Sequence, residues 1–172
     1  MSRAIGPATM VGGGKMRTFP RLARAAAPLH HQSHHIIPVG VFAGRAFAAH
    51  FEALSFHGFD ARQFEHNGVF LPATEGAAIC SGLPLHRGPH RRYNELVAYR
   101  VDAIFRDVDR ASCQPRARFD AVQRIDLLTS ALRAVLRRTS PRMSLNQRDP
   151  FHSSACFHDL DSACDAIWLA TK

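Results

Sequence analysis

Two short histidine blocks and one Asn-Gly block mark the part of the chain that could do chemistry. In order they are residues 34–38 (His-His-Ile-Ile-Pro), residues 67–72 (Asn-Gly-Val-Phe-Leu-Pro) and residues 86–90 (His-Arg-Gly-Pro-His). Neutral imidazoles bind divalent metals, and a further imidazole can act as a general base near neutral pH. Hydrolysis of a phosphodiester bond needs an activated water and a cation on the phosphate. The three blocks therefore predict a one-metal phosphodiesterase site.

The double histidine suits this chemistry because adjacent side chains on an extended segment point to opposite faces. One of the two histidines can then bind a metal while its neighbour faces the substrate. His86 and His90 would complete the ligand set and leave coordination positions open for water and a phosphate oxygen. Pro89 suits the first position of a helix, so we expect His86 before that helix and His90 in its first turn.

A second register would use His30 and His31 instead. It is less favoured because Gln32 and Ser33 follow those histidines, where His34 and His35 are followed by an apolar strand. His30 could still contact a phosphate near the site.

The apolar pattern predicts an α+β fold in which two short strands lie near the histidines. Strands are expected over residues 30–38 and 68–72, and helices over residues 43–56, 89–110, 116–138 and 154–170. A Gly- and Ala-rich loop is expected up to Pro84, and a polar linker over residues 139–153. The helix over 116–138 could pack on the rest of the chain, bind a partner, or contact DNA through Arg133, Arg137 and Arg138.

The charge distribution points to a polyanionic partner. The chain has 172 residues and a net charge of +8, and 20 of its 22 basic residues are arginine. Residues 84–148 hold 14 arginines against six acidic residues, and this excess begins beside the second histidine block. Arginines that neutralise phosphates release counterions, which favours nucleic-acid binding. Apolar stretches are short, so we expect no membrane partner and no secretory signal peptide.

The composition also divides the chain. Residues 1–29 contain no acidic residue and include a Gly-Gly-Gly run, so they are expected to form a flexible basic leader. Residues 30–110 hold all three blocks and are expected to form the catalytic domain. Residues 111–172 are expected to form a helical C-terminal extension.

In this order, the three blocks resemble the HNH, or ββα-metal, nuclease superfamily, and more narrowly the AHH nucleases of bacterial polymorphic toxin systems. The resemblance implies a ββα-metal core followed by additional helices. It also implies the following roles: His34, His86 and His90 bind the metal, His35 is the general base, and Asn67 braces the loop that carries this base. Arg87, Arg91 and Arg92 flank the site and are expected to bind the nucleic acid. Ser33 stands where the family name has alanine.

The resemblance also sets expectations for the biology. We expect the protein to be a metal-dependent endonuclease that cuts DNA with little sequence specificity. We also expect it to act as a toxin effector and to have an acidic immunity protein as its partner. The cofactor would be one divalent ion, with Mg²⁺, Mn²⁺, Zn²⁺ and Ni²⁺ all open. The site of action would be the cytoplasm of the producing or target bacterium, with export by a specialised secretion system as an option. Two alternatives remain: a nucleic-acid-binding protein with a structural zinc, and an RNase of the same fold.

Overall fold

The computed structural model describes residues 27–140, 142–152 and 162. Their elements, in chain order, are β1 (His31–His35), α1 (Val39–Phe42), α2 (Ala48–Ser55), α3 (Phe64–Asn67), β2 (Gly68–Pro72), α4 (Glu75–Ser81), α5 (Arg91–Arg110) and α6 (Gln114–Leu136). This is the predicted α+β class. The expected helix over 154–170 lies outside the described residues.

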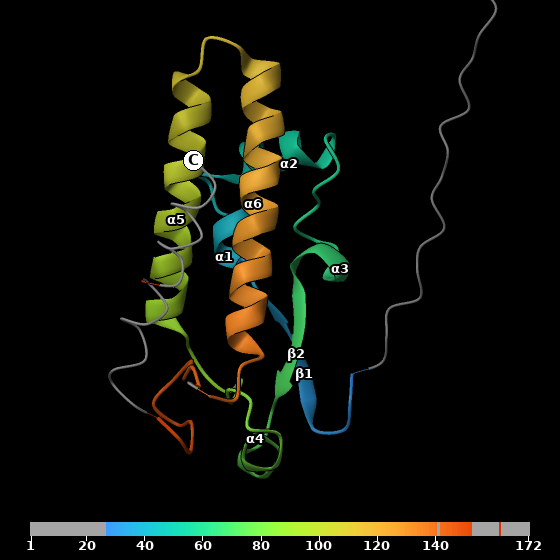
Figure 1. The fold of residues 1–172 in the computed structure, drawn as a ribbon, viewed down its shortest axis with the longest axis vertical. Helices are drawn as coiled ribbons and strands as arrows, with labels where there is room; N and C mark the ends of the chain where they lie inside the picture. Colours follow the sequence, from blue (N-terminus) through green and yellow to red (C-terminus); the bar gives the residue numbers. More distant parts are fainter. Residues whose placement is uncertain (1–26, 141, 153–161, 163–172) are drawn as a thin grey trace, which may run out of the picture.

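The two predicted strands pair with each other. β1 and β2 form an antiparallel two-stranded sheet in which His34 lies opposite Val69 and His35 opposite Gly68. The short helices α1, α2 and α3 occupy the connection between the strands (Figure 1). Pro38 ends the extended segment and is the N-cap residue of α1, so the predicted segment 30–38 is strand only over its first part.

Helices α5 and α6 lie side by side as an antiparallel pair (Figure 1). Their bounds differ by two residues at some ends from the predicted 89–110 and 116–138. α5 begins at Arg91 because Gly88 has a φ of 93°, a left-handed conformation that turns the chain before the helix. α6 starts at Gln114 and carries a proline in its first turn, as expected.

Two segments differ from the prediction in kind. Residues 75–81, expected as loop, form α4, because alanine favours helix and both ends are capped. The Thr74 hydroxyl accepts from the Ala77 N–H, and Gly82 adopts a φ of 69° at the C-cap. The helix expected over 43–56 forms only over α2, since residues 43–47 make a turn after α1.

One hydrophobic core joins all the larger elements. Its members include Ile36 and Ile37 after β1, Leu71 of β2, Phe51 and Leu54 of α2, Val97, Val101 and Ile104 of α5, and Ile125, Leu132 and Leu136 of α6. Met143 and Leu145 from the irregular segment after α6 are buried in it as well. Residues on both sides of position 110 therefore share one core. Among the described residues, no helix combines the length and apolarity needed to span a membrane.

Candidate functional site

Three histidines from separate parts of the chain meet at one end of the α5–α6 pair. His34 comes from β1, His86 from the loop after α4, and His90 is the N-cap residue of α5. The rings of His86 and His90 lie 4.8 Å and 5.4 Å from that of His34, centroid to centroid. Each residue offers one ligand atom, and these atoms all lie within 4.8 Å of one another. The structure thus brings together the three residues predicted to bind a metal.

The loop from His86 to His90 turns at a glycine. Gly88 has a φ of 93°, which a residue with a side chain rarely adopts, and Pro89 then leads into α5. His86 precedes the helix, as expected, whereas His90 is the N-cap instead of a residue of the first turn. This tight turn allows two histidines four positions apart to face the same point, with their rings 4.9 Å apart.

The chemistry of the cluster fits a divalent metal. Nε2 of His34, Nδ1 of His86 and Nδ1 of His90 are buried and have no hydrogen-bond partner in the described part of the chain. Such orphaned polar atoms are costly unless a ligand satisfies them. Metal ligation would do so, because imidazole nitrogen is a common ligand for zinc and related ions. The three histidines could therefore hold a metal.

The same burial keeps these histidines neutral. Desolvation, followed by the charges of His86, His90 and His35, lowers the pKa of His34 from 6.5 to about 2. Desolvation and then His90 lower the pKa of His86 to about 4, and desolvation also lowers the pKa of His90. Neutral imidazole is the form that binds a metal, so the site does not have to lose protons at neutral pH before it binds one.

His35 does not join the three-histidine cluster. As strand alternation requires, it points away from His34, and its ring lies 5.8 Å from that of Phe42 in α1. It is half-buried, which leaves part of the imidazole accessible. The predicted base and the predicted ligand thus lie on opposite faces of β1.

Asn67 is fully buried and fastens the chain just after His35. Its Oδ1 accepts from the Ile37 N–H at 2.6 Å, and its Nδ2 donates to the carbonyls of Ile37 and Ala61, each at 2.9 Å. The Asn67 carbonyl also accepts from the Ile36 N–H at 2.9 Å. Together these bonds hold the two residues that follow His35 against the start of β2.

Tyr93 is a core residue of α5 that also contacts the site. It is buried in α5, its ring lies 5.4 Å from that of His34, and its hydroxyl donates to the Ile36 carbonyl at 2.6 Å. Tyr93 therefore links α5 to the segment that carries both histidines. Its place one turn after His90 is a local sequence signal for this contact.

Arg133 of α6 also supports this region. Its guanidinium donates to the carbonyls of Gly68, Glu65 and His66, at 3.3, 3.1 and 2.7 Å. Of the three roles considered for this helix, packing on the rest of the chain is the one these contacts support for Arg133. Arg87, Arg91 and Arg92 are exposed at the loop and at the start of α5, beside the cluster.

Three other described histidines have different surroundings. His30 is exposed and His31 opens β1, and neither belongs to the cluster. His66 accepts from the Asp60 N–H at 3.1 Å and stacks on Phe59. These histidines are structural or peripheral in the described fold.

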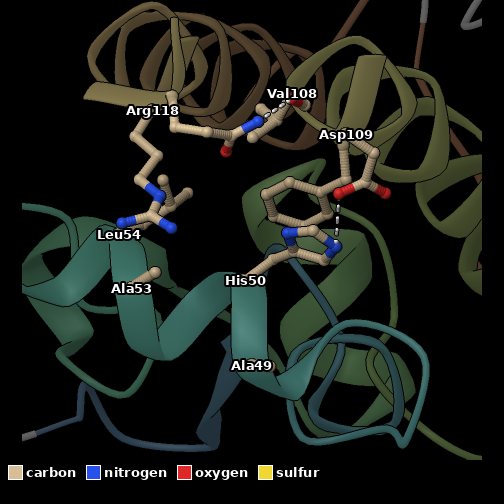
Figure 2. Close-up of a pocket in the computed structure, with 9 residues that line it drawn as sticks. Ala49, His50, Ala53, Leu54, Val108, Asp109 and Arg118 are labelled. Carbon is tan, nitrogen blue, oxygen red and sulfur yellow. Dashed lines mark hydrogen bonds and ion pairs between the residues drawn. The ribbon is translucent and has the colours of Figure 1, made fainter. Parts of the chain in front are cut away.

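His50 lines a separate cavity of about 220 Å³, between α2, the C-terminal end of α5 and the start of α6 (Figure 2). Its ring stacks on Phe105 at 4.4 Å, and its Nε2 lies 3.6 Å from Asp109 Oδ1. Leu54 and Val108 add apolar lining, and Arg118 borders the opposite side. This cavity contains none of the predicted site residues.

Comparison with known proteins identifies the family. The model of a nuclease family of the HNH/ENDO VII superfamily with conserved AHH matches residues 16–127, which is more than half of the chain. The comparisons with curated proteins and with solved structures gave no match. The match includes the histidine cluster, and the two-stranded sheet followed by helices is consistent with a ββα nuclease core. The chain therefore belongs to the AHH nuclease family of the HNH/ENDO VII superfamily.

Proposed function

We propose that this nuclease is a metal-dependent endonuclease that hydrolyses phosphodiester bonds in DNA with little sequence specificity. The observation that carries the proposal is the cluster of His34, His86 and His90. Three of its ring nitrogens are buried without a hydrogen-bond partner among the residues that the structure describes. A cluster kept neutral by burial is suited to a cation and poorly suited to a structural role in a metal-free protein.

The proposed metal ligands are His34, His86 and His90. A bound divalent ion would supply Lewis-acid polarisation of the phosphate and stabilisation of the leaving oxygen. Three imidazoles favour Zn²⁺ or Ni²⁺ by affinity, whereas Mg²⁺ and Mn²⁺ are harder partners for phosphate oxygen. The identity of the ion is therefore an outcome of the experiment below.

His35 is the proposed general base. A neutral imidazole can accept a proton from water, and this water then attacks the phosphate. Asn67 holds the backbone of Ile37, two residues further on, so it fixes the segment from which His35 projects. Arg87, Arg91 and Arg92 are exposed beside the cluster, where their guanidinium groups can bind phosphate oxygens. The N-terminal end of α5 adds to the attraction for an anion, because the backbone N–H groups of a helix start favour negative charge.

Plasmid cleavage tests this proposal. Wild-type protein is incubated with supercoiled DNA and with Mg²⁺, Mn²⁺, Zn²⁺ or Ni²⁺ in turn, beside His35→Ala and His50→Ala. We expect nicking by the wild type and by His50→Ala, and a loss of about 10²–10⁴-fold in His35→Ala. Equal cleavage by wild type and His35→Ala, or no cleavage with any metal, contradicts the proposal.

Two control measurements separate the alternatives. A matched RNA substrate distinguishes a DNase from an RNase of the same fold. A zinc that remains bound through purification, unfolding on chelation and an absence of strand cleavage would together favour a structural zinc in a nucleic-acid-binding protein. The toxin role, the acidic immunity partner, the bacterial compartment and the division at residues 29 and 110 stay predictions.

A further inference from the structure

The segment after α6 contacts the loop that carries His86. Residues 142–152, here called the clamp segment, contain no regular helix or strand, yet Met143, Leu145 and Asp149 are buried. Polar side chains of this segment reach the backbone of residues 83–85, just before His86. In Figure 1 the segment lies in orange-red beside the lower end of α5, where the loop enters that helix.

Both backbone polar groups of Leu85 are held by the clamp segment. The Leu85 N–H donates to Asp149 Oδ2 at 2.8 Å, and the Leu85 carbonyl accepts from Asn146 Nδ2 at 2.8 Å. Two residues before Leu85, the Leu83 carbonyl accepts a hydrogen bond from Arg142 Nη2 at 2.6 Å. Leu85 itself is fully buried. Three side-chain contacts thus fix a three-residue stretch of loop backbone.

These side chains are themselves held in place. Arg142 Nη2 lies 2.7 Å from Asp149 Oδ1, and the side chain of Asp149 is 0% exposed. The Phe151 N–H also donates to Asp149 Oδ1 at 3.0 Å, and the guanidinium of Arg142 lies over the Phe151 ring. A buried ion pair with several hydrogen bonds has a well-defined geometry, because any departure exposes an unpaired charge to an apolar environment.

His86 is the next residue after this fixed stretch. Its own N–H donates to the Pro72 carbonyl at the end of β2, at 2.7 Å. The loop is therefore held by the clamp segment on one side and by the sheet on the other. The family model matches the chain only up to residue 127, so the clamp segment lies beyond the matched region.

We propose that Asp149 and Asn146, with Arg142, are positioning residues that fix the approach of His86 to the metal. This inference rests on the proposed metal site, and it gives part of the predicted C-terminal extension a direct role in that site. The clamp segment acts through the backbone of Leu85 and touches neither metal nor substrate. Without it, His86 loses its fixed distance from His34 and His90, and three-point coordination weakens.

Titration of the full chain with Co²⁺, followed by visible absorption, tests the inference. Wild type is compared with Asn146→Ala, Asp149→Ala and His86→Ala. Asn146 is half-buried and outside the ion pair, so its variant keeps the test valid if Asp149→Ala does not fold. Val108→Ala is the matched control, because it opens the core near the far end of α5, about 27 Å along the helix from His90.

We expect Co²⁺ affinity to fall about tenfold or more in Asn146→Ala and Asp149→Ala, with a changed absorption band, because supporting residues of a metal site tune both affinity and geometry. Val108→Ala should lower thermal stability and leave affinity and spectrum unchanged. Cleavage by Asn146→Ala should recover at saturating metal.

Two outcomes overturn the inference in different ways. If wild type binds Co²⁺, His86→Ala loses it and both clamp variants keep wild-type affinity within twofold, the clamp inference is wrong and the metal site stands. The inference is also wrong if Val108→Ala weakens Co²⁺ binding as much as the clamp variants do. If wild type binds no Co²⁺, the proposed metal site and this inference fall together.

Discussion

The two ends of α5 use the same residue type in opposite ways. At the N-terminal end, His34, His86 and His90 face one another with buried nitrogens that have no partner in the described residues. At the C-terminal end, roughly 30 Å away along the helix, the His50 ring stacks on Phe105 and its nitrogen lies 3.6 Å from Asp109 Oδ1. Within the described part of the chain, the ring nitrogens of the first group have no partner, whereas His50 has one in Asp109.

This difference separates a ligand-binding histidine from a structural one. A folded protein can accept an orphaned buried nitrogen where a ligand later satisfies it, and elsewhere the cost favours a partner within the protein. His66, which accepts from the Asp60 N–H and stacks on Phe59, follows the pattern of His50. Burial alone therefore does not indicate a functional histidine. Burial together with an unpaired ring nitrogen does.

The largest expected difference between the two ends of α5 appears when one histidine is removed from each end in turn. His86→Ala should reduce metal-dependent cleavage by about 10³-fold or more, since the metal contributes several kcal/mol to the transition state. His50→Ala should cleave at the wild-type rate. Single-turnover cleavage of plasmid DNA at fixed metal concentration measures both. Comparable losses in the two variants would break the distinction between the ends.

A smaller effect is expected from the amide side chains that fasten the backbone at each end. Asn67→Ala leaves the Ile37 N–H, the Ile37 carbonyl and the Ala61 carbonyl without their buried partner, and should lower the free energy of unfolding by about 3 kcal/mol. Gln114→Ala removes two bonds near the surface, to the carbonyls of Val108 and Ala111, and should cost about 1 kcal/mol.

Urea unfolding of the two variants measures this difference. The comparison is sharpened if Asn67→Ala also loses cleavage at temperatures where it remains folded, because Asn67 then positions His35 as well as stabilising the fold. Equal destabilisation by both variants would mean that the hydrogen bonds of Asn67 and of Gln114 contribute equally to stability.

The third prediction concerns acid. The pKa values of His34 and His86 are about 2 and about 4 in the folded protein, against an ordinary 6.5, so only the unfolded chain takes up these protons just below pH 6.5. Without added metal, the contribution of these histidines to the free energy of unfolding should therefore be at its maximum above pH 6.5. It should fall as the pH drops, by up to about 1.4 kcal/mol per pH unit for each such histidine.

Denaturation curves between pH 7 and pH 5 test this sign. His86→Gln should show a shallower slope than wild type, whereas His50→Gln should keep the wild-type slope. A stability that is flat or rises toward pH 5 would contradict neutral burial of the cluster.

The smallest effect is expected at the far end. The His50–Asp109 contact is 3.6 Å long and the Asp109 side chain is 63% exposed, so Asp109→Asn should change the free energy of unfolding by less than about 1 kcal/mol. Co²⁺ affinity should stay at the wild-type value. A metal-affinity change in this variant would show that the two ends communicate through α5.

The sequence predicted the parts that depend on local pattern. The strand over 68–72 and the long apolar periodicities of α5 and α6 have clear signals, and the ordered histidine blocks identified the three residues that meet. α4 was missed because its Gly- and Ala-rich composition has no amphipathic pattern, and its capping by Thr74 is a weak signal in isolation.

The supporting contacts could not be predicted because they join distant segments. Asp149 reaches Leu85 across 64 residues and Arg133 reaches Gly68 across 65, and neither pairing has a spacing rule. The stretch over residues 139–153 is polar and has two prolines, which is typical of a linker. Its described residues 142–152 nevertheless pack into the core through Met143 and Leu145. Buried polar networks of this kind depend on the assembled fold.

The register in which β1 pairs with β2 also determines which face of the strand His34 and His35 each occupy. His34 and His35 are chemically the same, and a shift of one residue in the register would exchange their faces. Gly68 lies opposite His35 and so close to the Phe64 ring that a Cβ on residue 68 would overlap this ring. The neighbouring Asn67 side chain forms hydrogen bonds with the N–H and the carbonyl of Ile37. Asn67 and Gly68, some thirty residues downstream, thus help to determine which of the two histidines faces His86 and His90.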